Sequence, residues 1–151
     1  GWRIDWTRHA GGYEFWMEGM FVWIDDETGQ LHNFSNRVTR NVPKLIKRLT
    51  FGEAENLAKT RAIKKFVAWD PKWESKFRLT HWREWRLMIV YPDDSGELTK
   101  DEVDATRNKP VLAYQFNYAS DWTGDPAAKE SWPLFWSVYV DAETGKIIRS
   151  E

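Results

Sequence analysis

The sequence of 151 residues contains no cysteine, so the chain forms no disulfide and offers no thiolate ligand to a metal ion. Its three histidines, His9, His32 and His81, lack the H-x-x-x-H or H-x-H spacing of zinc sites. No apolar run approaches the ~20 residues that a membrane-spanning helix needs, and the N-terminus does not resemble a signal peptide. We expect no metal, no other cofactor and no insertion into a membrane. If the protein is exported, we expect its targeting segment to have been removed.

The sequence also lacks the local patterns of common enzyme active sites. It has no G-x-S-x-G elbow, no phosphate-binding glycine loop and no dinucleotide fingerprint. Carboxylates cluster at residues 25–27, 93–94 and 101–102, but none of these clusters has the spacing of a calcium loop, and turn chemistry explains all three. Two catalytic carboxylates far apart in the chain would leave no such pattern, and nothing favours a particular pair. We predict that the protein is not an enzyme.

Aromatic residues are abundant, with 11 Trp, 8 Phe and 5 Tyr. Large rings dominate the burial of apolar surface, so most of them should fill a core between helix and sheet. Trp82 and Trp85 differ in parity, so one of them should face outward unless their strand bends. Trp122 and Trp132 flank an acidic loop that contains Pro and Gly. We interpret these four tryptophans as candidate partner-binding residues; the alternative is that their rings cap the core beneath the loop.

The net charge of −1 conceals three blocks of opposite sign. The charge is −4 over residues 1–36, +9 over residues 37–91 and −6 over residues 92–151. The basic middle block could attract an acidic polymer, or it could lie against an acidic block of its own chain or of a neighbouring repeat. We favour the second explanation. We expect no binding of nucleic acid, which needs a continuous basic track beside exposed aromatic rings.

The chain contains an internal repeat built around a turn. Residues 21–31 read FVWIDDETGQL and residues 136–148 read WSVYVDAETGKII, so each copy predicts a strand, a tight turn and a second strand. We expect the aspartates to organise these hairpins through bonds to backbone amides, with a left-handed glycine at the end of each turn. The motif therefore indicates a repeated fold and no catalysis. Its residues are Asp25 and Gly29 in the first copy and Asp141, Thr144 and Gly145 in the second.

One amphipathic helix is the most clearly marked element. Thr50 and Glu53 form a capping box, which predicts a helix that starts at Thr50. Pro71 ends it, because the residue before a proline avoids helical geometry. Apolar residues recur at the spacing of one helix face. They are Phe51, Ala54, Ala58, Ala62 and Phe66.

Period-two alternation predicts the strands. Residues 77–91 read as one strand, or as two with a bend near His81, and residues 111–118 as another. Residues 13–34 read as two strands joined by a turn, and residues 1–12 as a further strand of the first copy or as a frayed end. We match residues 111–118 of the second copy with residues 13–15 of the first.

The order of elements predicts an α+β fold in which one main amphipathic helix packs on an antiparallel β-sheet. A second capping box predicts a short helix over residues 100–107. We divide the chain into the C-terminal hairpin of a truncated preceding repeat (residues 1–36), a linker (residues 37–48) and a complete domain (residues 49–151).

This pattern resembles a known family. A strand that ends in Val-Asp-Ala-x-Thr-Gly-Lys-Ile, at residues 140–147, after a single amphipathic helix resembles the PepSY domain. That domain occurs in propeptides of thermolysin-like peptidases, in YpeB, and as tandem copies in YcdB/YcdC-type proteins of the bacterial envelope. The likeness covers residues 49–151, with residues 13–34 as the tail of a preceding copy. It implies one helix on an antiparallel sheet and an extracellular or cell-envelope location.

Three functions are compatible with these observations. The first is a non-catalytic binding or regulatory module that contacts a peptidase or another envelope protein, as the PepSY resemblance implies, through a sheet edge and exposed aromatics. The second is a structural spacer whose main contacts are with neighbouring repeats of the full-length chain. The third is binding of cell-wall polymer through aromatic stacking or the basic block. We favour them in that order.

Overall fold

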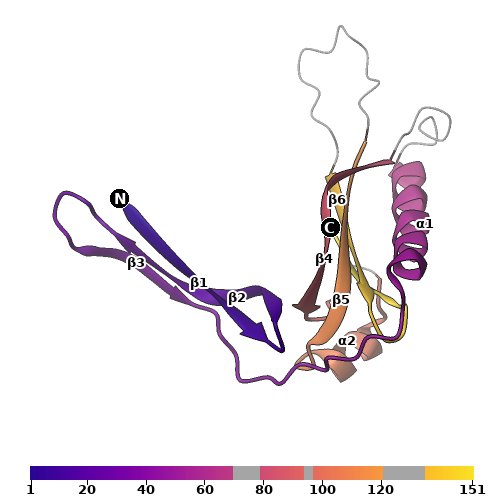
Figure 1. Cartoon of the computed structure of the whole chain (residues 1–151), viewed down its shortest axis with the longest axis horizontal. Coiled ribbons are helices and arrows are strands. Elements are labelled where there is room, and N and C mark those ends of the chain that lie inside the picture. The colour runs from indigo at the N-terminus through magenta and orange to yellow at the C-terminus, as the bar shows by residue number, and fades with distance from the viewer. Residues whose placement is uncertain (70–78, 94–96, 121–134) are drawn as a thin grey trace, which may run out of the picture.

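The computed structural model describes residues 1–69, 79–93, 97–120 and 135–151. Within these residues the fold is α+β, with seven strands in a mostly antiparallel sheet and two helices (Figure 1). The elements are β1 (Trp2–Ala10), β2 (Tyr13–Ile24), β3 (Leu31–Asn36), α1 (Phe51–Trp69), β4 (Leu79–Val90), α2 (Lys100–Thr106), β5 (Val111–Ser120), β6 (Phe135–Asp141) and β7 (Ile147–Ser150).

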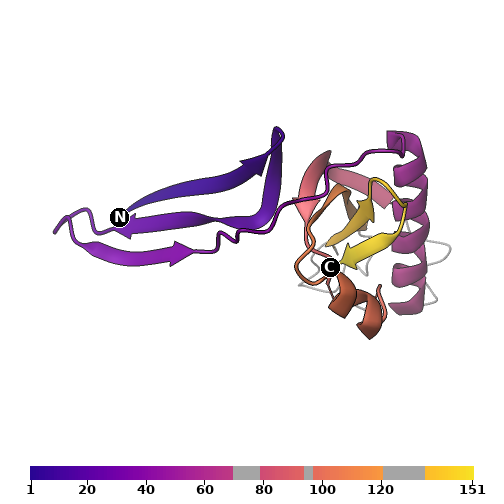
Figure 2. The same ribbon diagram turned by 90° about the horizontal axis from the view of Figure 1, so that it is seen from below.

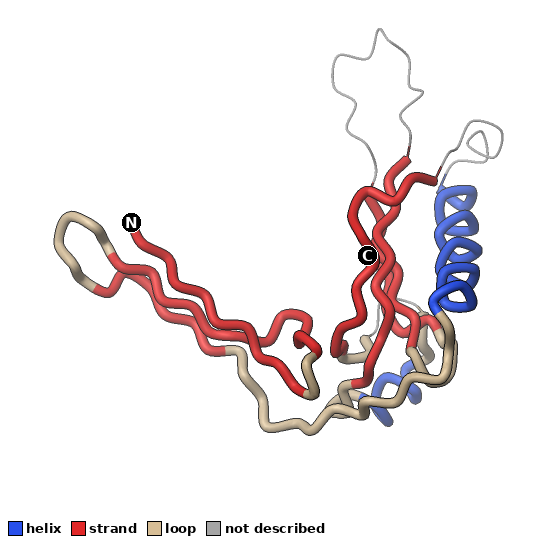
Figure 3. The backbone as a smooth tube through the Cα atoms, viewed as in Figure 1, coloured by secondary structure: helices blue, strands red, loops and turns tan. Residues whose placement is uncertain are grey.

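The sheet has two parts that are joined through β2. The strand order is β1-β2-β4-β5-β6-β7, with β3 paired to β2 beside this path. Neighbouring strands are antiparallel except β2 and β4, which are parallel and meet at Phe15 and Ile89. Strands β1–β3 form an arm that extends away from the rest of the molecule, and β4–β7 form the main sheet (Figure 3). We call these two parts the arm and the main sheet.

Helix α1 forms where the sequence predicts it. The Thr50 N–H donates to Glu53 Oε2 over 2.8 Å, and the Glu53 N–H donates to Thr50 Oγ1 over 3.4 Å, which confirms the capping box. Ala54, Ala58 and Ala62 are fully buried. Their small side chains let the helix lie close to the sheet, and α1 contacts β5 and β6 along one face (Figure 2).

The main sheet is covered differently on its two faces. On the α1 side a core cluster contains the three alanines of the helix together with sheet residues and Phe15 of the arm. The buried sheet residues of this cluster are Ile89, Leu112, Tyr114, Phe116, Tyr118, Val138, Val140 and Ala142. A smaller cluster on the opposite face contains Met88, Val90, Ala113, Tyr139 and Ile148, against which Trp16 of the arm packs. The arm therefore contributes to both clusters.

The two predicted hairpin turns have the same hydrogen bonds. The aspartate Oδ1 accepts from the N–H groups two and three residues later, over 3.0 and 2.8 Å for Asp25 and over 2.7 and 3.0 Å for Asp141. The threonine hydroxyl, Thr144 in the second copy, accepts from the N–H two residues later over 3.3 Å in both turns. Gly29 and Gly145 have φ of +69° and +76°. Each of the five motif residues thus takes part in its turn, through a side-chain hydrogen bond or a left-handed backbone.

The match between residues 111–118 and residues 13–15 is wrong, because β1 takes the position of β5. Trp2 pairs with Ile24, the last residue before Asp25, and Tyr114 pairs with Val140, the last residue before Asp141. In the first copy the preceding strand joins directly through Gly11 and Gly12, whose positive φ values of 57° and 83° permit a two-residue hairpin. In the second copy a longer stretch of sequence separates β5 from β6. The spacing of strands along the sequence therefore does not reveal that both copies have the same strand order.

Basic residues of the middle block bind carboxylates of the acidic C-terminal block. Lys44 and Arg48 both pair with Glu143, beside the second turn. Arg61 of α1 binds both carboxylate oxygens of Glu97, which is nearly buried, over 2.6 Å each. These contacts support the interpretation that the basic block lies against an acidic block of its own chain.

The linker predicted at residues 37–48 joins the main sheet at its end. The Lys44 N–H donates to the Pro110 carbonyl over 2.8 Å, and the Leu112 N–H donates to the Lys44 carbonyl over 3.1 Å. The N–H groups of Arg48 and Leu49 both donate to the carbonyl of Ala142 in the second turn, over 2.8 and 3.0 Å. The boundaries at residues 36 and 48 stay predictions.

The environments of the two turn glycines predict different costs of substitution. A β-carbon at Gly145 would lie 3.2 Å from both Leu49 Cδ2 and Leu57 Cδ1, whereas none of the described atoms lies within 4 Å of one at Gly29. Gly29→Ala should cost about 1 kcal/mol, the penalty of a left-handed alanine, and Gly145→Ala about 1 kcal/mol more, because the turn packs against α1. Urea denaturation followed by circular dichroism measures both. Equal costs would contradict this account of the second turn.

Candidate interaction surface

The structure describes the surroundings of only one of the four candidate tryptophans. Trp85 is 45% exposed, and its ring centroid lies 4.9 Å from that of Phe51 and 6.0 Å from that of Tyr114. It therefore lies on the α1 side, at the border of the core. Trp122 and Trp132 lie outside the described residues, and only the backbone of Trp82 is described. Partner binding by these four residues stays a prediction.

The prediction that Trp82 and Trp85 face opposite sides holds only for a regular strand, and β4 is not regular. Its pairing with β5 shifts between His81 and Arg83, and again between Arg83 and Arg86. The bend predicted near His81 thus coincides with the first of these irregularities. Because they fall between and around the two tryptophans, sequence parity does not determine which side of the sheet each one occupies.

A row of exposed apolar residues lies on one face of the arm. Trp2, Ile4 and Trp6 alternate along β1 and pair with residues of β2, so that their side chains share one face. Leu31 and Phe34 of β3 pair with the same region of β2 and extend this face. We call it the apolar arm face. Its exposed residues are Trp2 (70% exposed), Ile4 (45%), Trp6 (48%), Met20 (37%), Leu31 (63%) and Phe34 (54%).

The opposite face of the arm is more polar. Arg3 donates to Asp5 at 2.8 to 3.0 Å, and its guanidinium lies 4.5 Å from the centroid of the Phe21 ring. A shallow pocket of about 360 Å³ lies where β1 and β2 separate, and its lining includes Arg3, Asp5, Glu14 and Arg37. These charges are of both signs, so the pocket favours no particular class of ligand.

The apolar arm face is not among the predicted sites, although the sequence carries a signal for it. Residues 2–7 read Trp-Arg-Ile-Asp-Trp-Thr, a strict alternation of apolar and polar residues. Such alternation predicts a strand with one apolar face. Position within the chain gave no indication that this face would be exposed, because in the second copy the matching residues are buried.

A bulge in β2 connects the arm to the main sheet. Thr7 pairs with Gly19 and His9 pairs with Glu14, so more residues of β2 than of β1 lie between the two pairs. Met17, in the bulge, has φ of +60°, in the left-handed region that residues with a β-carbon rarely adopt.

The two residues that precede Met17, Phe15 and Trp16, pack against the main sheet. Phe15 is fully buried in the α1-side core, with the Arg8 guanidinium 4.0 Å from its ring centroid. Trp16 packs on the opposite face, edge-on to Tyr139 at 5.7 Å between centroids, with the Arg149 guanidinium 3.8 Å from its ring. Two consecutive residues of β2 thus pack on opposite faces of the main sheet at its edge.

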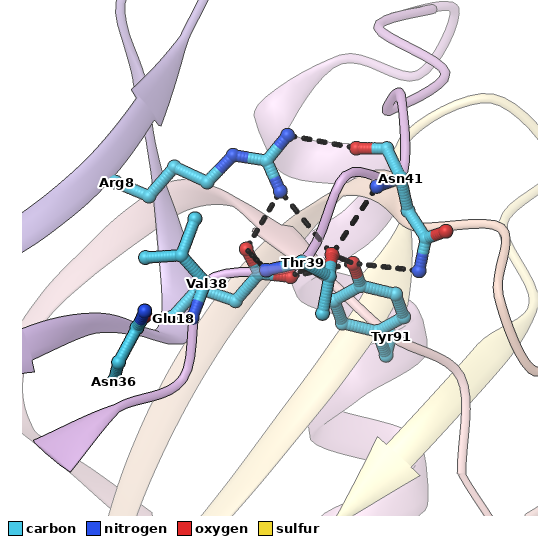
Figure 4. A network of polar contacts seen from close by, with 7 residues as sticks. All are labelled: Arg8, Glu18, Asn36, Val38, Thr39, Asn41 and Tyr91. Carbon is cyan, nitrogen blue, oxygen red and sulfur yellow. Dashed lines mark hydrogen bonds and ion pairs between the residues drawn. The ribbon is translucent and has the colours of Figure 1, made fainter.

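A polar network around Glu18 lies between the arm and the main sheet (Figure 4). We call this network, together with Phe15, Trp16 and Met17, the joint. Glu18 is only 5% exposed, and it accepts from Arg8 Nη1 over 2.6 Å, the Tyr91 hydroxyl over 2.5 Å and the Thr39 hydroxyl over 2.8 Å. The Thr39 N–H also donates to it over 3.2 Å. Arg8 donates further to the carbonyl of Asn41 over 2.8 Å, and the Asn41 amide donates to Tyr91 over 3.3 Å. The network links strands β1 and β2 of the arm, the linker and Tyr91, which directly follows β4.

The network holds Glu18 in its ionised form. Burial raises the pKa of Glu18, but the hydrogen bonds from Tyr91, Arg8 and Thr39 together outweigh it, so the pKa lies below the ordinary value of 4.5. Burial, and then the hydrogen bond to Glu18, raise the pKa of Tyr91 above its ordinary value of 10.0. Glu18 therefore accepts hydrogen bonds at neutral pH and Tyr91 donates one.

The described residues contain neither a metal-binding cluster nor a helix that could cross a membrane. No group of three or more His, Asp or Glu side chains is placed to hold a metal ion. No helix in the same part of the chain has the length and apolar character to cross a membrane.

Comparisons with known proteins give similarity in structure and no match in sequence. No family model and no curated protein matches the sequence. Among solved structures, the chain is similar to the C-terminal domain of YpeB from Bacillus megaterium, with a TM-score of 0.47 and 17% sequence identity. The alignment covers 99% of this chain, which spans 50% of the length of that one.

Acidification should weaken the joint. Because the pKa of Glu18 is lowered by folding, its contribution to stability is present above pH 4.5 and is lost as the pH falls through the folded-state pKa. Glu18→Gln should lower the free energy of unfolding at pH 7 by about 3 kcal/mol, since it leaves Arg8 without its buried partner. It should also reduce the loss of stability between about pH 5 and pH 3. Urea denaturation over this pH range measures both effects, with Glu27→Gln in the exposed turn as control; an unchanged acid response would contradict the assignment.

Met17 offers a second test of the joint. Since its side chain is 57% exposed and its φ is +60°, Met17→Gly should raise the free energy of unfolding by about 0.5 kcal/mol through relief of strain. Met17→Val should lower it by about 1 kcal/mol or more, because a β-branched residue is least compatible with this backbone. Thermal unfolding of the two variants beside the parent chain gives the comparison. The opposite order would show that the bulge does not depend on this conformation.

Proposed function

We propose that this chain is a non-catalytic module that binds another protein through the apolar arm face. The observation that carries the proposal is the row of exposed apolar residues on β1, two of them tryptophans, on a sheet that extends away from the main domain. Large contiguous apolar patches on a folded protein are typical of interaction sites. Tryptophan in particular is enriched among the residues that dominate binding energy.

The polar residues of the joint support a non-catalytic role. Glu18 is a buried carboxylate, and its hydrogen bonds from Arg8, Thr39 and Tyr91 favour its ionised form and lower its pKa. A general acid near neutral pH would need a raised pKa instead. Glu18 is therefore suited to holding the arm in position and unsuited to transferring a proton.

The class of partner follows from the sequence resemblance. PepSY domains occur beside peptidases and in proteins of the bacterial envelope, so the proposed partner is a peptidase or another envelope protein, and the proposed location is extracellular or in the cell envelope. Regulation of a peptidase by this module would then act through occupation of the arm.

One observation favours the spacer function as a second candidate. The arm repeats the turn of the main sheet with the same hydrogen bonds, as units of a tandem array do. On this hypothesis the apolar arm face contacts a neighbouring repeat of the full-length protein and no separate partner. The two candidates differ in whether the apolar arm face captures a separate protein from an envelope extract.

Capture from an envelope extract tests the first candidate. Ile4→Glu places a charge on the apolar arm face, and Thr7→Glu places the same charge on the opposite face of the same strand as a matched control. We expect the parent chain and Thr7→Glu to crosslink to the same protein, identified by mass spectrometry, and Ile4→Glu to lose at least about nine-tenths of the signal. Capture of no protein by the parent chain would favour the spacer, and equal capture by all three chains would exclude the apolar arm face as the binding site.

A further inference from the structure

The arm repeats the last three strands of the main sheet in the same order and register. Strands β1, β2 and β3 correspond to β5, β6 and β7, and the pairs Trp2–Ile24, Ile4–Val22 and Trp6–Met20 correspond to Tyr114–Val140, Phe116–Val138 and Tyr118–Trp136. Even the irregularity is shared, because the β2–β3 register shifts after Trp23 and the β6–β7 register shifts after Tyr139. We call strands β1–β3 the first unit and strands β5–β7 the second unit. The paired residues of the two units therefore correspond one to one.

This equivalence assigns a counterpart to the apolar arm face. Its β1 residues match Tyr114, Phe116 and Tyr118, which are at most 2% exposed. In the main sheet these residues belong to the core cluster that Ala54 and Ala58 of α1 complete. The apolar arm face is thus the surface that a helix covers in the second unit.

The two turns also differ in whether a helix covers them. Gly145 lies against Leu49 and Leu57, at the start of α1, whereas Gly29 faces open space among the described atoms. The Ala142 carbonyl accepts from two N–H groups at the approach to α1, of which Leu49 is one. The first turn has the same conformation and is exposed to solvent, so it is shaped for the same contact.

Charge indicates what kind of helix fits. Glu143 in the second turn pairs with Lys44 and Arg48, which immediately precede α1. Its counterpart, Glu27, is exposed, and residues 1–36 carry a net charge of −4. A helix that approaches the arm in the same way would therefore need basic residues before its first turn.

We infer that the partner of the apolar arm face is a basic amphipathic α-helix with a stripe of small residues. This inference rests on the proposed function and specifies its partner. The helix lies across β1 and β2 as α1 lies across β5 and β6, its small residues against Ile4 and Val22 and its basic N-terminal flank beside Glu27. The recognition mode is a helix on an apolar sheet face, with anchors at helical spacing.

A second copy of the chain fits this surface less well. Helix α1 is already packed on its own sheet, with Ala54, Ala58 and Ala62 fully buried, so a second molecule has no free helix of this type to offer. Two arms packed face to face would bring together two units that each carry a net charge of −4. Like charges brought together oppose association.

A synthetic peptide of residues 44–69 serves as the probe, because it has the required basic flank and alanine stripe. The full chain is labelled with 15N at the tryptophan indoles, and the signals of Trp2 and Trp6 are assigned with Trp2→Phe and Trp6→Phe. We expect saturable shifts of these two signals on addition of the peptide. Ile4→Glu, and independently Leu31→Glu, should weaken binding at least about tenfold, and Thr7→Glu should leave it unchanged. A peptide with Ala58→Glu should bind at least about tenfold more weakly.

Three outcomes would overturn the inference. The first is the absence of shifts at Trp2 and Trp6 up to about 1 mM peptide. The second is shifts confined to Trp85 and Trp136, which would mean that the peptide replaces α1 on the main sheet. The third is self-association of the parent chain that Ile4→Glu abolishes, which would make a second copy the occupant. If the envelope partner is still captured in an Ile4-dependent manner, the proposed function survives and only the helical partner is excluded.

Discussion

The buried carboxylate of Glu18 is the interaction on which the relation of the two parts of this molecule depends. It accepts hydrogen bonds from residues of the arm, the linker and β4, so that three segments far apart in the chain meet at one ion. A buried charge of this kind stabilises only the arrangement that satisfies it, because any other leaves it without partners. Phe15 and Trp16 add apolar contacts on the two faces of the main sheet.

The bulge at Met17 explains how strand β2 belongs to both parts of the sheet. Up to Phe15, β2 belongs to the edge of the main sheet, and beyond Gly19 it is the central strand of the arm. A regular strand would continue straight, whereas the left-handed residue redirects the backbone within a few residues. The same bulge that buries Phe15 therefore carries the rest of β2, and with it the apolar arm face, away from α1. Exposure of this face follows from the geometry of the joint.

Much of the fold was predictable because its signals are local. The start of α1 follows from a capping box, and the turns at Asp25 and Asp141 follow from side-chain bonds that span three residues. The candidate site was not predictable in this way. Abundant tryptophan directed attention to Trp82, Trp85, Trp122 and Trp132, whereas the exposed aromatics that the structure describes on the arm are Trp2, Trp6, Trp23 and Phe34. Local alternation identifies an apolar face but does not show what covers it.

The sequence by itself determined the elements and the repeated turn of this protein, since these depend on hydrogen bonds and periodicities within a few residues. Only the tertiary structure decided that β1, and not residues 13–15, is the counterpart of β5, because strand pairing joins residues that the sequence separates by different distances in the two copies. The tertiary structure also decided that one of two equivalent apolar faces is buried and the other is exposed. Burial depends on whether another element covers the surface, and in this chain α1 packs on β5 and β6.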